Sequence, residues 1–542
     1  MGGIVHDPPS AATQRRVEAV ISTLLGSGVM NGAESMVRTL LGSGVDVCFA
    51  NPGTSEMHFV AALDQVPGMR AVLGLFEGVV TGMADGYGRM AGKPAATLLH
   101  LGPGLGNGLA NLHNARRANT PVVNVVGDHA TYHGRYDAPL ASDIAGVARN
   151  VSGWVHTATS ARSVAADAAR AVQAAMQAPH QVATLILPAD VAWGEAERPA
   201  PPLPVAEPTP VTDDTIAAVA TALTNGRRTA VLLGGAALGP EGLDAGGRIA
   251  AATGAMVLCD TFTARLARGA GRYPVARIPY FAEQIVDLLK DVEQLVLVGT
   301  KPPVAFFAYP GKPSVGLPDG AEVLVLSHPH EEPVAALQAV VERVGANAAD
   351  PGRATHTVDG STDGRLDQFS IGRLIAAHLP EGAIVSDEAA TSGLGAQLSL
   401  ATAAPHDHLS LTGGSIGQGL PVANGAAVAC PDRKVVCLHG DGGAMYTLQA
   451  LWTQAREQLD VTTVIFANRS YAILNIELAR VGAVGGATAN SMLDLGNPNL
   501  DWVHLANGMG VEAVRVETLP AFADAYSSAM RTKGPRLIEV VL

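Results

Sequence analysis

The chain has 542 residues, of which 48% are hydrophobic and 16% are charged. A chain of this length is expected to form about two to four globular domains, and its composition excludes a wholly disordered protein. With 36 Lys and Arg against 49 Asp and Glu, the formal net charge of −13 argues against nucleic acid or a membrane surface as a partner.

Targeting signals are missing from the sequence as given. It contains no apolar run of about 18 residues and no basic segment leading into an apolar one at its start, so we expect neither a membrane span nor a secretory signal. The four cysteines show no CxxC spacing, which is typical of reduced thiols in a cytoplasmic protein. Because the first well-patterned segment begins at Met30, we interpret residues 1–29 as an N-terminal extension.

Short apolar runs alternate with longer amphipathic segments in three blocks of the chain. We expect domains at 30–195, 214–345 and 366–542, joined by a proline-rich linker at 196–213 and a small, polar linker at 346–365. This alternation predicts the α/β class, with three doubly wound parallel-sheet domains. The expected strands are Val45–Ala50, Ala95–Leu99, Val122–Val126, Ala183–Leu187, Ala230–Leu233, Met256–Leu258, Gln294–Val298, Glu322–Leu326, Ala383–Val385, Lys434–Leu438, Val461–Ala467 and Pro535–Val541.

In the first block, polar side chains follow apolar runs. They are Thr54, Glu77, His100 and His129. A lone glutamate in such a place is also compatible with an exposed strand end, and a lone histidine with a ring bonded to backbone. His129 and His133 are four residues apart, which leaves a metal site as a further alternative.

The third block contains the most specific motif, His439-Gly440-Asp441-Gly442-Gly443, directly after a predicted strand and before an expected helix at Met445–Gln458. A carboxylate between glycines at the end of a strand can lie beside backbone N–H groups that hold a diphosphate. Asn468 follows the next strand, and parallel strands end at the same edge of a sheet. Asp441 and Asn468 could therefore share one Mg²⁺, which takes few protein ligands and keeps phosphate oxygens and water.

These motifs resemble those of the thiamine-diphosphate-dependent acetolactate synthase and 2-oxo-acid decarboxylase family, in which GDG is followed further along by NN. This chain has Ala467 at the first Asn and keeps the second as Asn468. The resemblance covers residues 30–542 and makes the three domains the pyrimidine-binding, middle and diphosphate-binding domains of that family. It implies a metal site of Asp441, Asn468 and the Ser470 backbone carbonyl, with cofactor contacts from Gly440, Gly442, Gly443 and Ile473.

The resemblance also implies roles for the other candidates. In the segment GGSIGQGLP, Ile416 stands where the family bends its cofactor over a bulky apolar side chain. Glu77 falls on the glutamate that hydrogen-bonds N1′ of the aminopyrimidine ring, where a carboxylate assists proton transfer.

Thr54 and His100 resemble the active-site serine and histidine of benzoylformate decarboxylase, and an imidazole is suited to proton transfer at neutral pH. His129 replaces a glutamine that is usual in the family, so substrate handling is expected to differ. The decarboxylase's second histidine has no counterpart in Pro303–Tyr309. The expected pocket wall consists of Tyr471, Ile473, Ile476 and Glu477.

The resemblance implies an enzyme that binds thiamine diphosphate and Mg²⁺, decarboxylates a small 2-oxo acid and transfers the acyl anion to a second carbonyl, as an acetolactate synthase does. Gly102-Pro103-Gly104 favours this carboligase. Two alternatives stay open: a nonoxidative decarboxylase of the benzoylformate decarboxylase type, favoured by Thr54 and His100, and a catalytically silent cofactor-binding relative.

The resemblance has further implications for cofactor and assembly. FAD is not expected, because the middle block lacks the flavin-contacting motifs of acetolactate synthases. In the family, the first domain of one subunit and the third domain of its neighbour hold the cofactor together. We therefore expect a homodimer or homotetramer with shared active sites.

Overall fold

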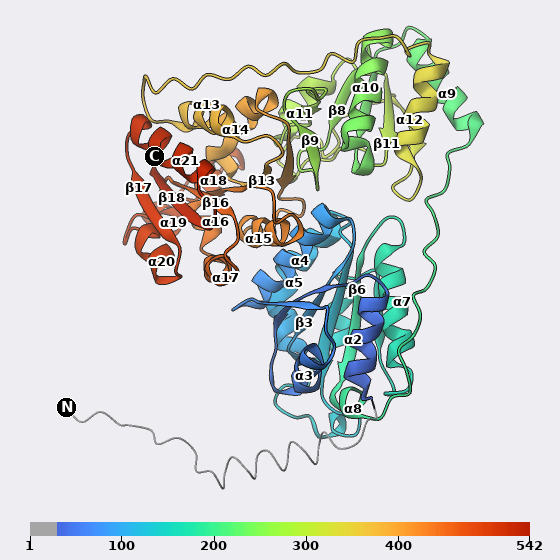
Figure 1. The fold of residues 1–542 in the computed structure, drawn as a ribbon. Helices are drawn as coiled ribbons and strands as arrows, with labels where there is room; N and C mark the ends of the chain where they lie inside the picture. Colours follow the sequence, from blue (N-terminus) through green and yellow to red (C-terminus); the bar gives the residue numbers. More distant parts are fainter. Residues whose placement is uncertain (1–29) are drawn as a thin grey trace, which may run out of the picture.

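The computed structural model describes residues 30–542, which form three α/β domains, each built on its own sheet (Figure 1). The expected fold class is confirmed. The expected extension at 1–29 lies outside the described residues. No helix in residues 30–542 is long and apolar enough to cross a membrane.

The first domain has a six-stranded parallel sheet of order β2-β1-β3-β4-β6-β5. Its central strands are buried on both faces because helices cover both sides, which explains their nearly continuous apolar sequences. The elements are α2 (Gly32–Gly42), β1 (Val47–Asn51), α3 (Met57–Gln65), β2 (Arg70–Leu73), α4 (Glu77–Ala91), β3 (Ala95–Leu99), α5 (Leu101–Arg117), β4 (Val122–Asp128), α6 (Ile144–Ala148), β5 (Trp154–Thr157), α7 (Val164–Met176), β6 (Val182–Pro188) and α8 (Ala189–Trp193).

The middle domain follows a segment without helix or strand at 197–208 and has a parallel sheet of order β10-β8-β7-β11-β12. Thr212 caps its first helix by accepting a hydrogen bond from the Thr215 backbone. The elements are α9 (Asp213–Thr224), β7 (Thr229–Leu233), α10 (Pro240–Thr253), β8 (Met256–Cys259), β9 (Leu266–Arg268), β10 (Ala276–Arg277), α11 (Ala282–Leu289), β11 (Gln294–Val298), β12 (Glu322–Ser327) and α12 (Pro333–Arg343).

The third domain has a seven-stranded sheet of order β17-β18-β16-β15-β13-β14-β9. Its edge strand β9 comes from the middle block and runs antiparallel to β14, so this sheet is not wholly parallel. The elements are α13 (Gln368–His378), β13 (Ile384–Glu388), α14 (Leu394–Ser399), β14 (His406–Ser410), α15 (Gly419–Ala429), β15 (Val435–Gly440), α16 (Asp441–Ala444), α17 (Ala450–Glu457), β16 (Val461–Ala467), α18 (Ala472–Arg480), α19 (Ala487–Leu493), α20 (Trp502–Gly508), β17 (Glu512–Val516), α21 (Leu519–Arg531) and β18 (Arg536–Val541).

The first and third domains meet where α4 packs against α15 (Figure 1). A Cβ atom at Gly86 would lie 2.1 Å from the Val422 carbonyl oxygen, and one at Gly425 would lie 1.9 Å from the Met83 oxygen. These close approaches require glycine. A buried ion pair reinforces the contact: Arg89 binds Asp85 at 2.6 Å on its own helix and donates to the Ser410 carbonyl at 2.8 Å in the third domain.

The expected helix at Met445–Gln458 is wrong in its first half. The chain forms α16, then a turn over 445–449, then α17. The Thr447 hydroxyl donates to the Gly417 carbonyl at 2.9 Å, and a Cβ at Gly417 would lie 2.6 Å from Tyr446 Cβ. These contacts draw Tyr446 and Thr447 toward the Gly417 turn, and this explains why the helix is interrupted there.

The pKa of one carboxyl group in the middle domain predicts how the stability of the protein changes with pH. Burial raises the pKa of Asp260, which follows β8, to about 6, and the Thr300 hydroxyl donates to it at 2.8 Å. In the unfolded chain the same carboxyl ionises at about pH 4. The folded protein therefore loses stability as the pH rises from about 4 to about 6, and the loss persists at higher pH.

We therefore expect Asp260→Asn to stabilise the protein at about pH 8, by at most about 3 kcal/mol, with no gain at about pH 4. The amide oxygen can still accept from Thr300. Melting temperatures at both pH values measure the effect, and Asp319→Asn, at an exposed position of the same domain, is the control. Equal shifts at both pH values would contradict the explanation.

Candidate active site

A histidine–glutamate pair lies at the carboxyl edge of the first sheet. His100 follows β3, and its Nδ1 lies 2.9 Å from Oε2 of Glu56, which is buried in the short helical turn after β1. Glu56 also accepts from the Gly53 backbone at 2.7 Å and from the Ser55 hydroxyl at 2.5 Å. The pairing means that His100 is bonded to a carboxylate and not to backbone.

Two glycines make room for this pair. A Cβ at Gly53 would lie 2.2 Å from the His100 ring, and one at Gly127, in β4, would lie 1.7 Å from Glu56 Oε1. Leu101, next to His100, has φ +48°. A non-glycine residue in the left-handed region carries strain, and such residues concentrate at functional sites.

Glu77 is the first residue of α4 and is 7% exposed, so it is not an exposed strand end. The Asn107 side chain donates to its Oε2 at 3.0 Å from α5. A Cβ at Gly104 would lie 3.3 Å from Glu77 Oε1 and 3.4 Å from His100 Cβ. Glu77 and His100 therefore both lie beside Gly104.

The other two candidates of this domain lie at the same edge. Thr54 is exposed in the turn that contains Glu56, and its side chain makes no described hydrogen bond. His129 follows β4, its Nε2 is buried without a partner, and its ring centroid lies 5.4 Å from that of His133. Within residues 30–542 no group of three His, Cys, Asp or Glu side chains could hold a metal ion, so the His129–His133 metal site gains no support.

In the third domain, Asp441 and Asn468 lie at the ends of neighbouring strands β15 and β16. Asp441 accepts from the Gly442 backbone at 2.9 Å and from the Arg469 backbone at 2.8 Å, so it contacts the residue that follows Asn468. Arg469 has φ +54°, and the Ser470 backbone donates to Asn468 Oδ1 at 3.0 Å. Burial raises the pKa of Asp441, and the backbone hydrogen bonds oppose that rise.

The remaining cofactor candidates surround this pair. Gly440, Gly442 and Gly443 form the end of β15 and the start of α16, while Ile416 lies half-buried in the turn before α15. A Cβ at Gly442 would lie 2.5 Å from the Tyr471 ring. Ile473 lies half-buried in α18, directly after the loop that holds Asn468 and Ser470.

An aromatic group of the middle domain covers part of the third domain. A Cβ at Gly414 would lie 2.4 Å from the Phe306 ring, so Phe306, from the stretch that lacks the second histidine, lies against the turn of Ile416. The Tyr309 hydroxyl donates to Glu477 at 3.0 Å. Of the expected pocket wall, Tyr471 and Glu477 are half-buried and Ile476 is 40% exposed.

The two groups of candidates approach each other within one chain. The Asn111 amide donates to the Gly78 carbonyl at 2.8 Å and to the Gly417 carbonyl at 3.4 Å. Gly78 follows Glu77, and Gly417 follows Ile416. No described hydrogen bond joins the Glu77 carboxylate to the group around Asp441.

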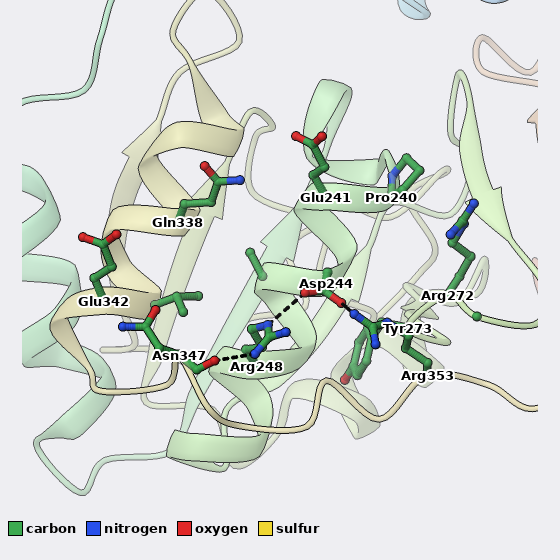
Figure 2. Close-up of a pocket in the computed structure, with 13 residues that line it drawn as sticks. Pro240, Glu241, Asp244, Arg248, Arg272, Tyr273, Gln338, Glu342, Asn347 and Arg353 are labelled. Carbon is green, nitrogen blue, oxygen red and sulfur yellow. Dashed lines mark hydrogen bonds and ion pairs between the residues drawn. The ribbon is translucent and has the colours of Figure 1, made fainter.

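A cavity of about 510 Å³ lies elsewhere, in the middle domain (Figure 2). Three of its charged side chains are paired, since Asp244 accepts from Arg248 at 2.8 Å and also from Arg353. It contains none of the predicted site residues.

Three polar contacts of these candidates were not predicted from the sequence. Glu56 bonds His100, Asn107 bonds Glu77, and the Asn468 amide donates to the Ser392 hydroxyl at 3.2 Å. For Glu56 a signal existed: it stands three residues after Gly53, the spacing of a side chain that caps the start of a helical turn.

Two models of a known protein family match the chain. The model of the N-terminal TPP binding domain of thiamine pyrophosphate enzymes matches residues 30–145, and that of the C-terminal TPP binding domain matches residues 390–540. These two matches contain all the candidates named above except the aromatic stretch of the middle domain.

Two relatives and one solved structure are similar to this chain over nearly its whole length. The "Putative acetolactate synthase large subunit IlvX" of Mycobacterium tuberculosis is 53% identical over 95% of this chain and 99% of its own. Benzoylformate decarboxylase of Pseudomonas aeruginosa is 28% identical over 91% of this chain and 95% of its own. The structure of a thiamine diphosphate-dependent 4-hydroxybenzoylformate decarboxylase from Rhodococcus jostii matches with a TM-score of 0.82 and 25% identity over 94% of this chain and 99% of that one.

The chain belongs to the family of thiamine-pyrophosphate-dependent enzymes, and it is related to acetolactate synthase and to benzoylformate decarboxylase.

Proposed function

We propose that this protein binds thiamine diphosphate together with Mg²⁺ and decarboxylates a 2-oxo acid. The observation that carries the proposal is the hydrogen bond from the Arg469 backbone to Asp441, which joins the start of α16 to the loop of Asn468 at one sheet edge. A carboxylate, an amide oxygen and the Ser470 carbonyl are ligands that fit Mg²⁺ bound with a diphosphate. When bound, thiamine diphosphate supplies the electron sink for decarboxylation.

Different residues of the chain bind the cofactor, bind the substrate and exchange a proton. Glu77 would bind N1′ of the aminopyrimidine ring, where its carboxylate assists proton transfer, and Ile416 would support the cofactor. Thr54 binds the substrate carboxylate. His100, whose Nδ1 faces Glu56, presents Nε2 as the nitrogen that can exchange a proton with the substrate.

For the fate of the acyl anion, we propose transfer to a second carbonyl, as in a carboligase. The full-length similarity to an acetolactate synthase-like protein supports this outcome. The second candidate is protonation, as in a nonoxidative decarboxylase, and the His100–Glu56 pair favours it because a proton donor stands ready at this edge.

The test is CO₂ release and product identification with pyruvate, 2-oxobutanoate and benzoylformate, each with thiamine diphosphate and Mg²⁺ present or omitted. A coupled product such as acetolactate from pyruvate supports the carboligase, and an aldehyde alone supports the decarboxylase. If no substrate gives cofactor-dependent CO₂ although the cofactor binds, the catalytically silent alternative gains support.

We further propose that two chains complete each active site and that the protein is a cytoplasmic homodimer or homotetramer. In one chain, the described contacts of Glu77 all come from the first domain, whereas the diphosphate and metal candidates lie in the third. Light scattering after gel filtration gives the mass, and a monomer with full activity would contradict this assembly.

Glu56→Gln tests the pairing with His100. Glutamine replaces one carboxylate oxygen by an NH2 group, which cannot accept the hydrogen bonds that this oxygen accepts in Glu56. The His100 ring should therefore lose its fixed orientation. We expect kcat to fall by about 10- to 100-fold, with the affinity for thiamine diphosphate unchanged.

A double variant shows whether Glu56 affects kcat through His100 or independently of it. If Glu56 acts through His100, adding Glu56→Gln to His100→Ala should lower kcat no further than His100→Ala alone. Independent, multiplying losses would contradict the pairing.

A further inference from the structure

Glu388, the last residue of β13, is a buried carboxylate that the function proposed above does not use. It is 6% exposed. Its Oε1 accepts from the Gly417 backbone at 2.6 Å, and its Oε2 accepts from the backbone of Gln418 at 2.7 Å and of Gly419 at 2.6 Å. Three short hydrogen bonds from successive N–H groups hold this turn against β13, and charge-assisted bonds of this kind are strong.

The same carboxylate also contacts the turn of the metal candidate. A Cβ at Gly443 would lie 3.0 Å from Glu388 Oε1 and 3.0 Å from the His439 ring. His439 Nε2 lies 3.3 Å from Glu388 Oε2, and a Cβ at Gly419 would lie 2.8 Å from His439 Cδ2. Glu388 and His439 therefore fill the space between the turn at 413–419 and the turn at 440–443.

We infer that Glu388 is a positioning residue for the cofactor: it fixes the turn that carries Ile416 relative to the turn that carries Asp441. The inference rests on the proposed function. Each turn provides one part of the predicted site, and Glu388 is the carboxylate that binds the first and packs against the second. The negative charge matters as well as the shape, because both oxygens accept from N–H donors.

A purely structural role is the alternative. The three N–H groups are at the start of α15, so Glu388 could serve only to cap that helix. A cap changes the stability of the helix and leaves the affinity for a cofactor alone, whereas a positioning residue changes both. The two roles therefore differ in a binding measurement.

The experiment compares Glu388→Gln with Asp387→Asn in the full-length protein. Asp387 is also buried and precedes Glu388 on β13, so its side chain points to the opposite face, where it accepts from the Ala389 backbone at 3.1 Å and from Gln397 at 3.3 Å. Calorimetric titration with thiamine diphosphate in the presence of Mg²⁺ gives the affinity. Hydrogen exchange of the Gly417–Gly419 amides without cofactor gives the state of the turn.

We expect Glu388→Gln to raise Kd for thiamine diphosphate by about tenfold or more, equivalent to about 1.4 kcal/mol, and to speed exchange of the three amides. Asp387→Asn should change neither by more than about threefold. Faster exchange with an unchanged Kd would reduce Glu388 to a helix cap, and unchanged exchange would show that its bonds do not hold the turn; either result overturns the inference. Failure of the unsubstituted protein to bind would instead overturn the proposed function, and this inference with it.

Discussion

Glu77→Gln is expected to lower cofactor-dependent CO₂ release by about 10²- to 10³-fold, the size of a lost acid–base contribution. Glu77 is 7% exposed, and its carboxylate is bonded by Asn107 at 3.0 Å. Glutamine keeps the shape and can keep that bond, so the loss should come from the missing carboxylate at N1′ and not from a cavity. The measurement is kcat with the best substrate, together with the Kd for thiamine diphosphate, which should rise less than kcat falls.

The control for this prediction is Asp167→Asn. Asp167 is a buried carboxylate of the same domain, on α7, where it pairs with Arg170 at 3.1 Å, away from the described contacts of Glu77. Its replacement should change stability and leave kcat within about threefold. If Glu77→Gln kept kcat within the same range, the role of Glu77 at N1′ would be contradicted.

The sequence predicted the central strands well because their environment is uniform. Helices bury both faces of β3, β4 and β16, so every position favours an apolar or β-branched residue and the run is visible locally. The edge strands β2 and β17 escaped prediction because their side chains are mostly exposed, as in Arg70 and Ala71 of β2. Strand β14, with the sequence HDHLS, was missed because its buried positions include two histidines.

Burial lowers the pKa of His408 in β14 to about 3 and that of His406 to about 4, so the neutral imidazoles can pack inside the sheet. No rule of hydrophobic periodicity identifies such a strand. The pairing of β9 with β14 was equally inaccessible, since it joins Leu266 to His408 across the boundary between two expected domains. Long-range pairing depends on tertiary packing and leaves no local pattern.

For the candidate site, the sequence predicted residues that follow strands and carry a recognisable motif. Asp441 and Asn468 could be placed together because parallel neighbours end at one edge. The pairing of Glu56 with His100 and the contacts of Glu388 could not be predicted, because the positions of the partners depend on the folded turns. A buried carboxylate that holds backbone is recognised only when its partners are known.

Asp441→Ala is expected to raise Kd for thiamine diphosphate in the presence of Mg²⁺ by about 100-fold or more, consistent with the loss of a bound divalent ion. Asp441 would be the one charged protein ligand of the proposed metal, since the other two are an amide and a backbone carbonyl. Its two oxygens are each held by one backbone N–H group, from Gly442 and Arg469. Removing the carboxylate therefore removes the charge and also frees the loop that positions Asn468.

The matched control lies at the opposite edge of the same sheet. Asp460 directly precedes β16, whose other end leads to Asn468, and it pairs with Lys434. Asp460→Asn removes a carboxylate from the same domain without touching the turn of Asp441, so its Kd should stay within about threefold of the unsubstituted protein. The affinity of the unsubstituted protein should also collapse when EDTA replaces Mg²⁺, whereas that of Asp441→Ala, already low, should hardly respond. An Asp441→Ala variant that still required Mg²⁺ for tight binding would place the metal elsewhere in the chain.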